Sequence, residues 1–166
     1  SAASDVYKRQ TICNKSRKVD EIMRVVVQRS GHAQCTVDGK ITGEIDNGLV
    51  LLVGFTAGDN EETINWLVHK ILNLRIFDDE NGVMNKSILD MGGKILSISQ
   101  FTLYADTKKG NRPSYIQALN GTQASSLYNL FNQKLSEHIP VETGIFGADM
   151  QISFTNQGPV TILLER

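Results

Sequence analysis

An uninterrupted apolar run at residues 49–55 limits the folds that this chain can adopt. The run lies between Gly48 and Gly58 and shows no alternation with polar side chains, which predicts a β-strand buried on both faces. It is far shorter than the roughly 18 apolar residues of a membrane-spanning helix, and no other segment reaches that length. The pattern therefore predicts a packed domain that contains a buried strand and has no membrane contact.

Shorter patterns predict the remaining strands. A β-branched run opens a strand that is predicted to end at residues 28–29. Residues 35–37 and 41–45 flank Asp38 and Gly39, a two-residue signature of a β-hairpin. Further strands are predicted at residues 94–104, 150–154 and 160–164.

Two segments have the signature of helices. Asp59 followed by Glu62 resembles a capping box, and apolar residues then recur at helical spacing. A second helix is predicted over residues 124–135, with Thr122 as its candidate N-cap. Together these elements predict one α+β domain over residues 23–166, with a mostly antiparallel sheet and two main helices.

The first 22 residues have almost no apolar periodicity and lie outside the predicted fold. Residues 5–10 read like a translated sequencing adapter, which makes the segment non-native and Met23 the natural start. The alternative is a disordered basic arm, and a signal peptide is excluded because the segment has no apolar core. The segment holds five basic and three acidic side chains, so the rest of the chain carries 12 basic and 15 acidic ones.

Charge and cysteine usage restrict the partners and the compartment. The whole chain has a formal net charge of -1, so any RNA contact must be a local basic patch rather than a broad basic surface. Cys13 and Cys35 lack CxxC spacing and cannot form a disulfide framework. This usage predicts a reducing, cytoplasmic setting.

No metal or nucleotide motif is complete. The acidic run at residues 78–82 lacks the ligand spacing of an EF-hand and predicts a hairpin turn instead. Residues 92–94 are followed by Ile95, where a phosphate-binding loop needs Ser or Thr. The histidines are scattered singly at His32, His69 and His138. We therefore expect no metal and no cofactor, and the sequence offers no obvious base–nucleophile pair.

Two segments depart from these simple patterns. Alternation in an extended strand places Gln100, Thr102 and Tyr104 on one face, either as a solvated face or as the floor of a site. Gly158 and Pro159 lie between two strand-like runs, although proline is poorly tolerated inside a sheet. The Gly–Pro pair therefore predicts a turn, a sheet edge or a cis peptide bond.

At these segments the sequence resembles the D-aminoacyl-tRNA deacylases, also called D-tyrosyl-tRNA deacylases. The resemblance covers essentially all of residues 23–166. It rests above all on Ser-Gln-Phe-Thr-Leu at residues 99–103 together with Asn-Gln-Gly-Pro-Val-Thr at residues 156–161. Residues 23–29, 109–114 and 143–150 support it. Ala105 and Ser30 depart from the usual Gly and Val, and neither departure touches an implied role.

The resemblance implies a D-aminoacyl-tRNA deacylase-like fold with a barrel-like sheet, and hydrolysis of the ester between a D-amino acid and tRNA. Glycyl-tRNA is expected as a further substrate, because glycine has no side chain to exclude. The resemblance also implies a homodimer with active sites at the subunit interface. In it, a cis Gly158–Pro159 peptide enters the partner's site as a chirality filter. No DNA partner is expected.

The matching motifs also imply site residues. Those of the catalytic pocket are Ser99, Gln100, Phe101 and Thr102. Phe146 is implied to lie near the adenine of the substrate. Phosphate contacts are predicted for Lys108, Lys109, Arg112 and Arg29, although the three loop residues fit a solvated turn equally well.

Two mechanisms are open at this site. Either Thr102 is a nucleophile, although its motif supplies no activating base, or the terminal ribose 2′-hydroxyl of the tRNA assists a water molecule. In the second mechanism, which we favour, backbone N–H groups around Phe101 and Thr102 stabilise the oxyanion. Two alternative functions remain: a deacylase of mischarged L-aminoacyl-tRNA with a trans Gly–Pro bond, and a non-catalytic nucleic-acid-binding module.

Overall fold

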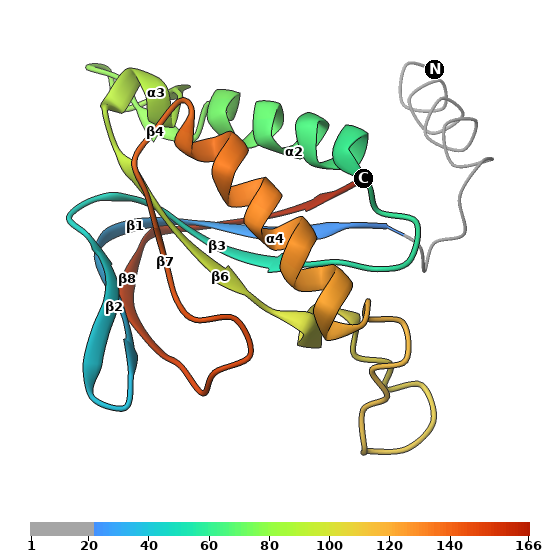
Figure 1. Cartoon of the computed structure of the whole chain (residues 1–166). Helices are drawn as coiled ribbons and strands as arrows, with labels where there is room; N and C mark the ends of the chain where they lie inside the picture. Colours follow the sequence, from blue (N-terminus) through green and yellow to red (C-terminus); the bar gives the residue numbers. More distant parts are fainter. Residues whose placement is uncertain (1–21) are drawn as a thin grey trace, which may run out of the picture.

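The computed structural model describes residues 22–166, and these residues form a mixed α+β domain (Figure 1). Residues 1–21, which include Cys13 and nearly all of the predicted extension, lie outside the described part of the chain. The elements are, in order, β1 (Arg24–Val37), β2 (Lys40–Ile45), β3 (Gly48–Gly54), α2 (Glu61–Asn73), β4 (Phe77–Asp78), β5 (Met84–Lys86), α3 (Ile88–Met91), β6 (Lys94–Ser99), the 3-10 helix η2 (Phe101–Tyr104), α4 (Gly121–Ser136), β7 (Val141–Thr143) and β8 (Gln151–Glu165). Between residues 22 and 166, no helix is long and apolar enough to cross a membrane.

One long strand, β1, replaces two strands that the sequence predicted separately. Its first half pairs with β3 and its second half with β2, while β8 runs along both halves. The register with β8 shifts on both sides of Ser30, so the backbone is irregular where the prediction ended the first strand. The predicted hairpin is confirmed, since Asp38 and Gly39 join β1 to β2 with positive φ angles of 50° and 75°.

The main sheet has the order β2-β1-β3-β6-β7, with β8 also paired to β1. The pairs of β1 are antiparallel, whereas β6 is parallel to both of its neighbours. Strands β2 and β7 close most of the remaining gap, because a Cβ atom at Gly43 would lie 2.6 Å from the carbonyl oxygen of Thr143. The predicted barrel-like α+β fold is thus confirmed, and within residues 22–166 the short helix α3 is present besides the two predicted helices.

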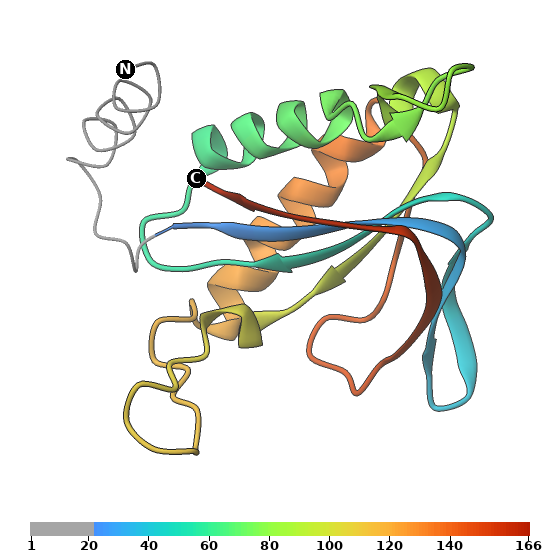
Figure 2. The same cartoon turned by 180° about the vertical axis from the view of Figure 1, so that it is seen from behind.

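Strand β3 is buried on both faces, as its apolar run predicted. One face carries Leu49, Leu51 and Val53 into the core beneath α2 and α4, which pack against each other across the sheet (Figures 1 and 2). The opposite face carries Val50 into a second cluster. That cluster consists of Ala33, Cys35, Ile45, Val50, Leu96 and Ile98.

Both main helices begin at an asparagine that the sequence patterns did not single out. Asn60 caps α2 and Asn120 caps α4, each accepting a hydrogen bond from the backbone N–H three residues further on. The predicted capping box at Asp59 is wrong, because this carboxylate accepts a hydrogen bond from the Thr56 N–H instead. Thr122 lies inside α4 and is not its N-cap.

Replacement of Gly48 by alanine should strongly destabilise the domain. Gly48 begins β3 with a φ angle of +139°, and an added Cβ atom would lie 1.8 Å from the backbone oxygen of Lys94. We expect Gly48→Ala to lower the free energy of unfolding by about 3 kcal/mol or more in urea denaturation. The control is Gly121→Ala, because a Cβ atom there meets nothing within 4 Å and alanine favours a helix. Equal stability of the two variants would contradict the close approach of β3 and β6.

Candidate active site

A cavity of about 560 Å³ lies where β3 and β6 end, beside the first turn of α4. Its walls come from four segments far apart in the sequence, namely the end of β3, the end of β6, residues 115–124, and residues 146–152 at the start of β8. Among the predicted site residues it is lined by Ser99, Gln100, Phe101 and Phe146. Tertiary packing therefore brings residues 99–101 and Phe146 to the same cavity.

The predicted strand at residues 94–104 is wrong in its second half. Strand β6 ends at Ser99, and residues 101–104 form the 3-10 helix η2. The alternation that placed Gln100, Thr102 and Tyr104 on one face therefore does not apply. The helical hydrogen bonds begin with the Leu103 N–H, which donates to the Gln100 carbonyl at 3.3 Å. The N–H groups of residues 101 and 102 precede this first turn and have no partner within the helix.

Tyr104 and two residues that the sequence patterns did not single out, Arg24 and Gly54, hold η2 in place. Arg24 donates from Nη1 to the Leu103 carbonyl at 2.9 Å. The Tyr104 hydroxyl donates to the Ile22 carbonyl at 2.6 Å and lies 3.2 Å from the Gly54 carbonyl, and burial raises the pKa of this phenol. A Cβ atom at Gly54 would lie 2.9 Å from the Tyr104 ring and 3.1 Å from the Gln100 carbonyl. Gly54 therefore allows the close contact between β3 and the turn.

Gln100 is the polar partner of Thr102. The side-chain amide of Gln100 donates a hydrogen bond to the Thr102 hydroxyl oxygen. An amide cannot accept the proton that a nucleophilic hydroxyl must lose. Thr102 itself is partly buried and does not line the cavity, whereas Gln100 does. This arrangement gives Thr102 a role in orienting Gln100.

Phe146 forms the opposite wall of the cavity, on the loop between β7 and β8. Its ring centroid lies 5.9 Å from that of Tyr128, a buried residue of α4. The Tyr128 hydroxyl donates to the carbonyl of Ser97 in β6 at 2.7 Å, and burial raises the pKa of this hydroxyl. The aromatic wall is thus supported by the same strand that delivers Ser99 to the pocket.

Gly158 and Pro159 lie in a bulge of β8, which is one continuous strand where the sequence predicted two. Residues 157–160 of β8 face only Arg29 of β1, because the flanking pairs are Asn156 with Ser30 and Thr161 with Gln28. The Gly158–Pro159 peptide bond is cis, and both residues are exposed. Neither lines the cavity of its own chain.

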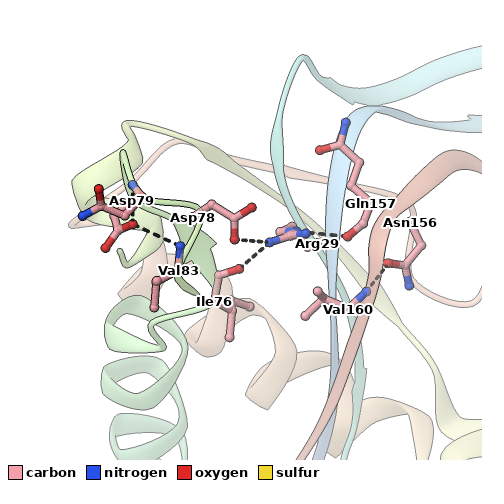
Figure 3. Close-up of polar contacts among 9 residues, drawn as sticks. Arg29, Ile76, Asp78, Asp79, Val83, Asn156, Gln157 and Val160 are labelled. Atoms are coloured by element: carbon pink, nitrogen blue, oxygen red, sulfur yellow. Dashed lines mark hydrogen bonds and ion pairs between the residues drawn. The ribbon is translucent and has the colours of Figure 1, made fainter. Parts of the chain in front are cut away.

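Arg29 and Asn156 hold this bulge from inside the chain (Figure 3). Arg29 donates from Nε to the Gln157 carbonyl at 3.0 Å and from Nη1 to the Ile76 carbonyl at 2.9 Å. The Asn156 side-chain oxygen accepts the Val160 N–H at 2.8 Å. The contacts of Arg29 direct it toward the bulge, and its role as a phosphate contact stays a prediction.

Lys108, Lys109 and Arg112 lie on the exposed loop between η2 and α4. Asp106 and Ser114 close the base of this loop through two backbone hydrogen bonds of 2.8 and 2.9 Å. None of the three cations forms an ion pair with a residue in the 22–166 range, and none lines the cavity. They form a local basic patch that does not line the cavity.

The sequence patterns also missed Tyr115, which lines the cavity beside Phe101. The two rings meet edge to face, with centroids 5.0 Å apart and planes inclined by 74°. A signal for Tyr115 existed, since it directly follows the motif at residues 109–114 that carries part of the resemblance.

The described residues contain no cluster of His, Cys, Asp and Glu that could hold a metal ion. The acidic segment at residues 78–82 forms the predicted hairpin turn between β4 and β5. The carboxylate of Asp79 accepts the N–H groups of Asn81 and Val83 at 2.8 and 3.0 Å, and these hydrogen bonds lower its pKa (Figure 3). The segment is therefore explained by local turn chemistry.

The chain matches a known protein family. A family model described as D-Tyr-tRNA(Tyr) deacylase matches residues 26–165. The chain is 58% identical over 145 residues to a D-aminoacyl-tRNA deacylase of Limosilactobacillus reuteri (strain DSM 20016), covering 87% of this chain and 100% of the relative. The same figures hold for the protein of that name from L. reuteri subsp. reuteri (strain JCM 1112).

Two solved structures share the fold. A c-Myc DNA Unwinding Element Binding Protein superimposes with a TM-score of 0.82 at 40% sequence identity, over 87% of this chain and 99% of that one. A probable eukaryotic D-amino acid tRNA deacylase gives a TM-score of 0.76 at 18% identity, over 87% and 100% of the two chains. Since the family model and the bacterial relatives span nearly all of residues 22–166, this chain belongs to the D-Tyr-tRNA(Tyr) deacylase family.

Proposed function

We propose that this chain hydrolyses the ester bond of D-aminoacyl-tRNA, and of glycyl-tRNA, to release the free amino acid and tRNA. The observation that carries the proposal is the cavity at the end of β6, because residues 99–101 line it and lie within the segment that matches the family model. Charged tRNA is consumed in translation, so we place this proofreading activity in the cytoplasm.

The cavity suits the aminoacyl-adenosine end of the substrate. Its volume of about 560 Å³ is that of a site for one small molecule, and its walls are mostly apolar. Phe146 offers an aromatic ring on which adenine can stack. The amino acid then lies toward Ser99 and Gln100, next to the turn at η2. No cofactor is needed for this reaction, because water supplies the attacking oxygen.

In the proposed mechanism, water attacks the carbonyl carbon of the ester while its proton passes to the terminal ribose 2′-hydroxyl. The resulting oxyanion is stabilised by the N–H groups of Phe101 and Thr102, which the 3-10 turn leaves without intrahelical partners. The ester C–O bond then breaks, and the ribose 3′-oxygen leaves with a proton relayed by the 2′-hydroxyl. Gln100, held by Thr102, orients the substrate beside these donors.

We further propose that the enzyme is a homodimer and that Gly158 and Pro159 complete the partner's pocket. The exposed bulge of β8 is absent from the cavity of its own chain, and Arg29 holds the bulge in one position. A fixed stretch of backbone at the amino-acid end of the pocket would collide with an L side chain. Rejection by collision needs no recognition of the side chain, so many D-amino acids should be accepted.

The mechanism predicts opposite outcomes for two changes at the pocket. Thr102→Ala should retain at least about a tenth of the wild-type kcat on D-tyrosyl-tRNA, because Thr102 is not the nucleophile. A substrate ending in 2′-deoxyadenosine should react about 100-fold more slowly, because it lacks the assisting hydroxyl. Both rates are measured as release of radiolabelled D-tyrosine over many turnovers.

Other outcomes of this experiment are equally informative. Full activity on the deoxy substrate, or a trapped acyl-enzyme that disappears in Thr102→Ala, would overturn substrate assistance. Tight binding of D-tyrosyl-tRNA by the wild-type chain without turnover would identify a nucleic-acid-binding module instead. Thr42→Ala is the matched control, since this threonine of β2 is partly buried like Thr102 but lies outside the cavity.

A further inference from the structure

An exposed aromatic pair, Phe101 and Tyr115, lies at the edge of the cavity. Phe101 is 58% exposed and Tyr115 is 38% exposed, although both line the cavity. Their rings contact each other edge to face at 5.0 Å, so the two side chains form one aromatic surface. An exposed aromatic surface at a pocket rim is a candidate binding surface.

The backbone fixes this aromatic pair from both sides. Phe101 begins η2, and the residues after Tyr115 are tied to the end of β3. The Thr56 hydroxyl donates to the Gln117 carbonyl at 2.6 Å, and the Leu119 N–H donates to the Phe55 carbonyl at 3.0 Å. The surface is therefore built before any ligand arrives, which lowers the entropic cost of binding.

The charge beside the pair indicates what the occupant is. Phe101 and Tyr115 flank the loop that carries Lys108, Lys109 and Arg112, and this loop projects beyond the ends of β3 and β6 (Figures 1 and 2). Within residues 22–166 these cations have no acidic partner. Protein interfaces are depleted of lysine, whereas stacking aromatics next to unpaired cations are typical of sites for single-stranded nucleic acid.

We propose that Phe101 and Tyr115 form a stacking platform for the nucleotide immediately 5′ of the terminal adenosine, with the loop at residues 106–114 contacting the adjoining phosphates. This inference rests on the proposed function and extends it from the terminal nucleoside to the single-stranded end of the tRNA. Stacking does not read base identity, so the platform adds affinity and direction and leaves the chemistry at η2 unchanged.

The test measures how much one added nucleotide improves the substrate. The probes are 3′-O-(D-tyrosyl)adenosine, the D-tyrosyl dinucleotide CpA, and the same dinucleotide with an abasic first position. For the wild-type chain we expect kcat/KM to be higher with CpA than with the nucleoside. With the abasic probe this gain should be about 10-fold smaller. Tyr115→Ala should show the same 10-fold smaller gain with CpA, and no further loss with the abasic probe.

Two variants separate stacking from loss of apolar surface or of structure. Tyr115→Phe keeps the ring and should keep the wild-type gain. Ile116→Ser removes a neighbouring side chain that is 89% exposed and does not line the cavity, and the gain should again be unchanged. The gain is a ratio within each variant, so it does not depend on the fraction of protein that is folded.

Several results would overturn the platform. One is an equal gain in wild type and Tyr115→Ala. Another is a shift of Tyr115→Ala toward monomer in analytical ultracentrifugation, together with an equal loss of kcat/KM on all three probes. That result would make Phe101 and Tyr115 a subunit contact. If the wild-type chain hydrolysed none of the probes and no D-aminoacyl-tRNA, the proposed function itself would fail.

Discussion

Hydrolysis of D-tyrosyl-tRNA at least about 100-fold faster than L-tyrosyl-tRNA is the expected result when the purified chain meets both substrates under the same conditions. The physical reason is the bulge at Gly158 and Pro159, which presents backbone rather than flexible side chains. Hydrogen bonds hold the bulge in place: Arg29 donates to the Gln157 carbonyl at 3.0 Å, and the Asn156 side chain accepts the Val160 N–H at 2.8 Å.

Glycyl-tRNA is the third substrate in this comparison and should be hydrolysed, since it carries no side chain for the bulge to reject. Arg29→Ala should reduce the ratio of D to L rates, because it removes the hydrogen bond to the Gln157 carbonyl. Arg75→Ala is the matched control: Arg75 is also an arginine that donates to a backbone carbonyl, but at Asn85, away from the bulge. Similar rates on D- and L-tyrosyl-tRNA would contradict the proposed chirality filter and would favour a deacylase of mischarged L-aminoacyl-tRNA.

Restoration of activity by mixing two inactive variants is the second large effect that we expect. One variant replaces Gln100 and Thr102 with bulky residues and so blocks its own pocket. The other, Gly158→Ala, displaces the bulge, because Gly158 has a φ angle of +126° that alanine rarely adopts. A heterodimer pairs the intact pocket of one chain with the intact bulge of the other. Random exchange of equal amounts should therefore recover about a quarter of the wild-type activity, from near zero, if dimers are two-fold symmetric.

Subunit exchange must be measured independently, by native mass spectrometry of chains with different tags. Each variant alone should melt cooperatively, which shows that it is folded. If heterodimers form and activity stays at the level of the separate variants, then the bulge acts within its own subunit or the site is not at the interface. A wild-type chain that remains monomeric at micromolar concentration would refute the shared site directly.

Much of the fold followed from local patterns in the sequence. The apolar run at residues 49–55 predicted a strand buried on both faces, and the helical spacing of apolar residues placed both main helices. Asp38 and Gly39 predicted their hairpin because few residues accept the positive φ angles of such a turn. The motifs at residues 99–103 and 156–161 also identified the family, which the comparisons confirmed.

The errors occurred where long-range contacts overrule a local pattern. Residues 100–104 read as strand, but Arg24 and Tyr104 hold them in a 3-10 turn against Gly54. Strand β1 continues through Ser30 because β8 pairs with it on both sides of the irregularity. The predicted cap of α2 was wrong for a similar reason, since the Asp59 carboxylate accepts a hydrogen bond from the Thr56 N–H and does not cap the helix.

The sequence by itself determined which residues form the buried strand, the two helices and the family motifs, because these depend on side-chain chemistry and short spacings. Only the tertiary structure decided how the motifs lie relative to one another. Packing of β3, β6 and α4 brings Ser99, Gln100 and Phe101 to one cavity with Phe146 and Tyr115. Gly158 and Pro159 are exposed outside this cavity. The reason is that residues 157–160 of β8 face the single residue Arg29 of β1 and therefore bulge out of the strand pair.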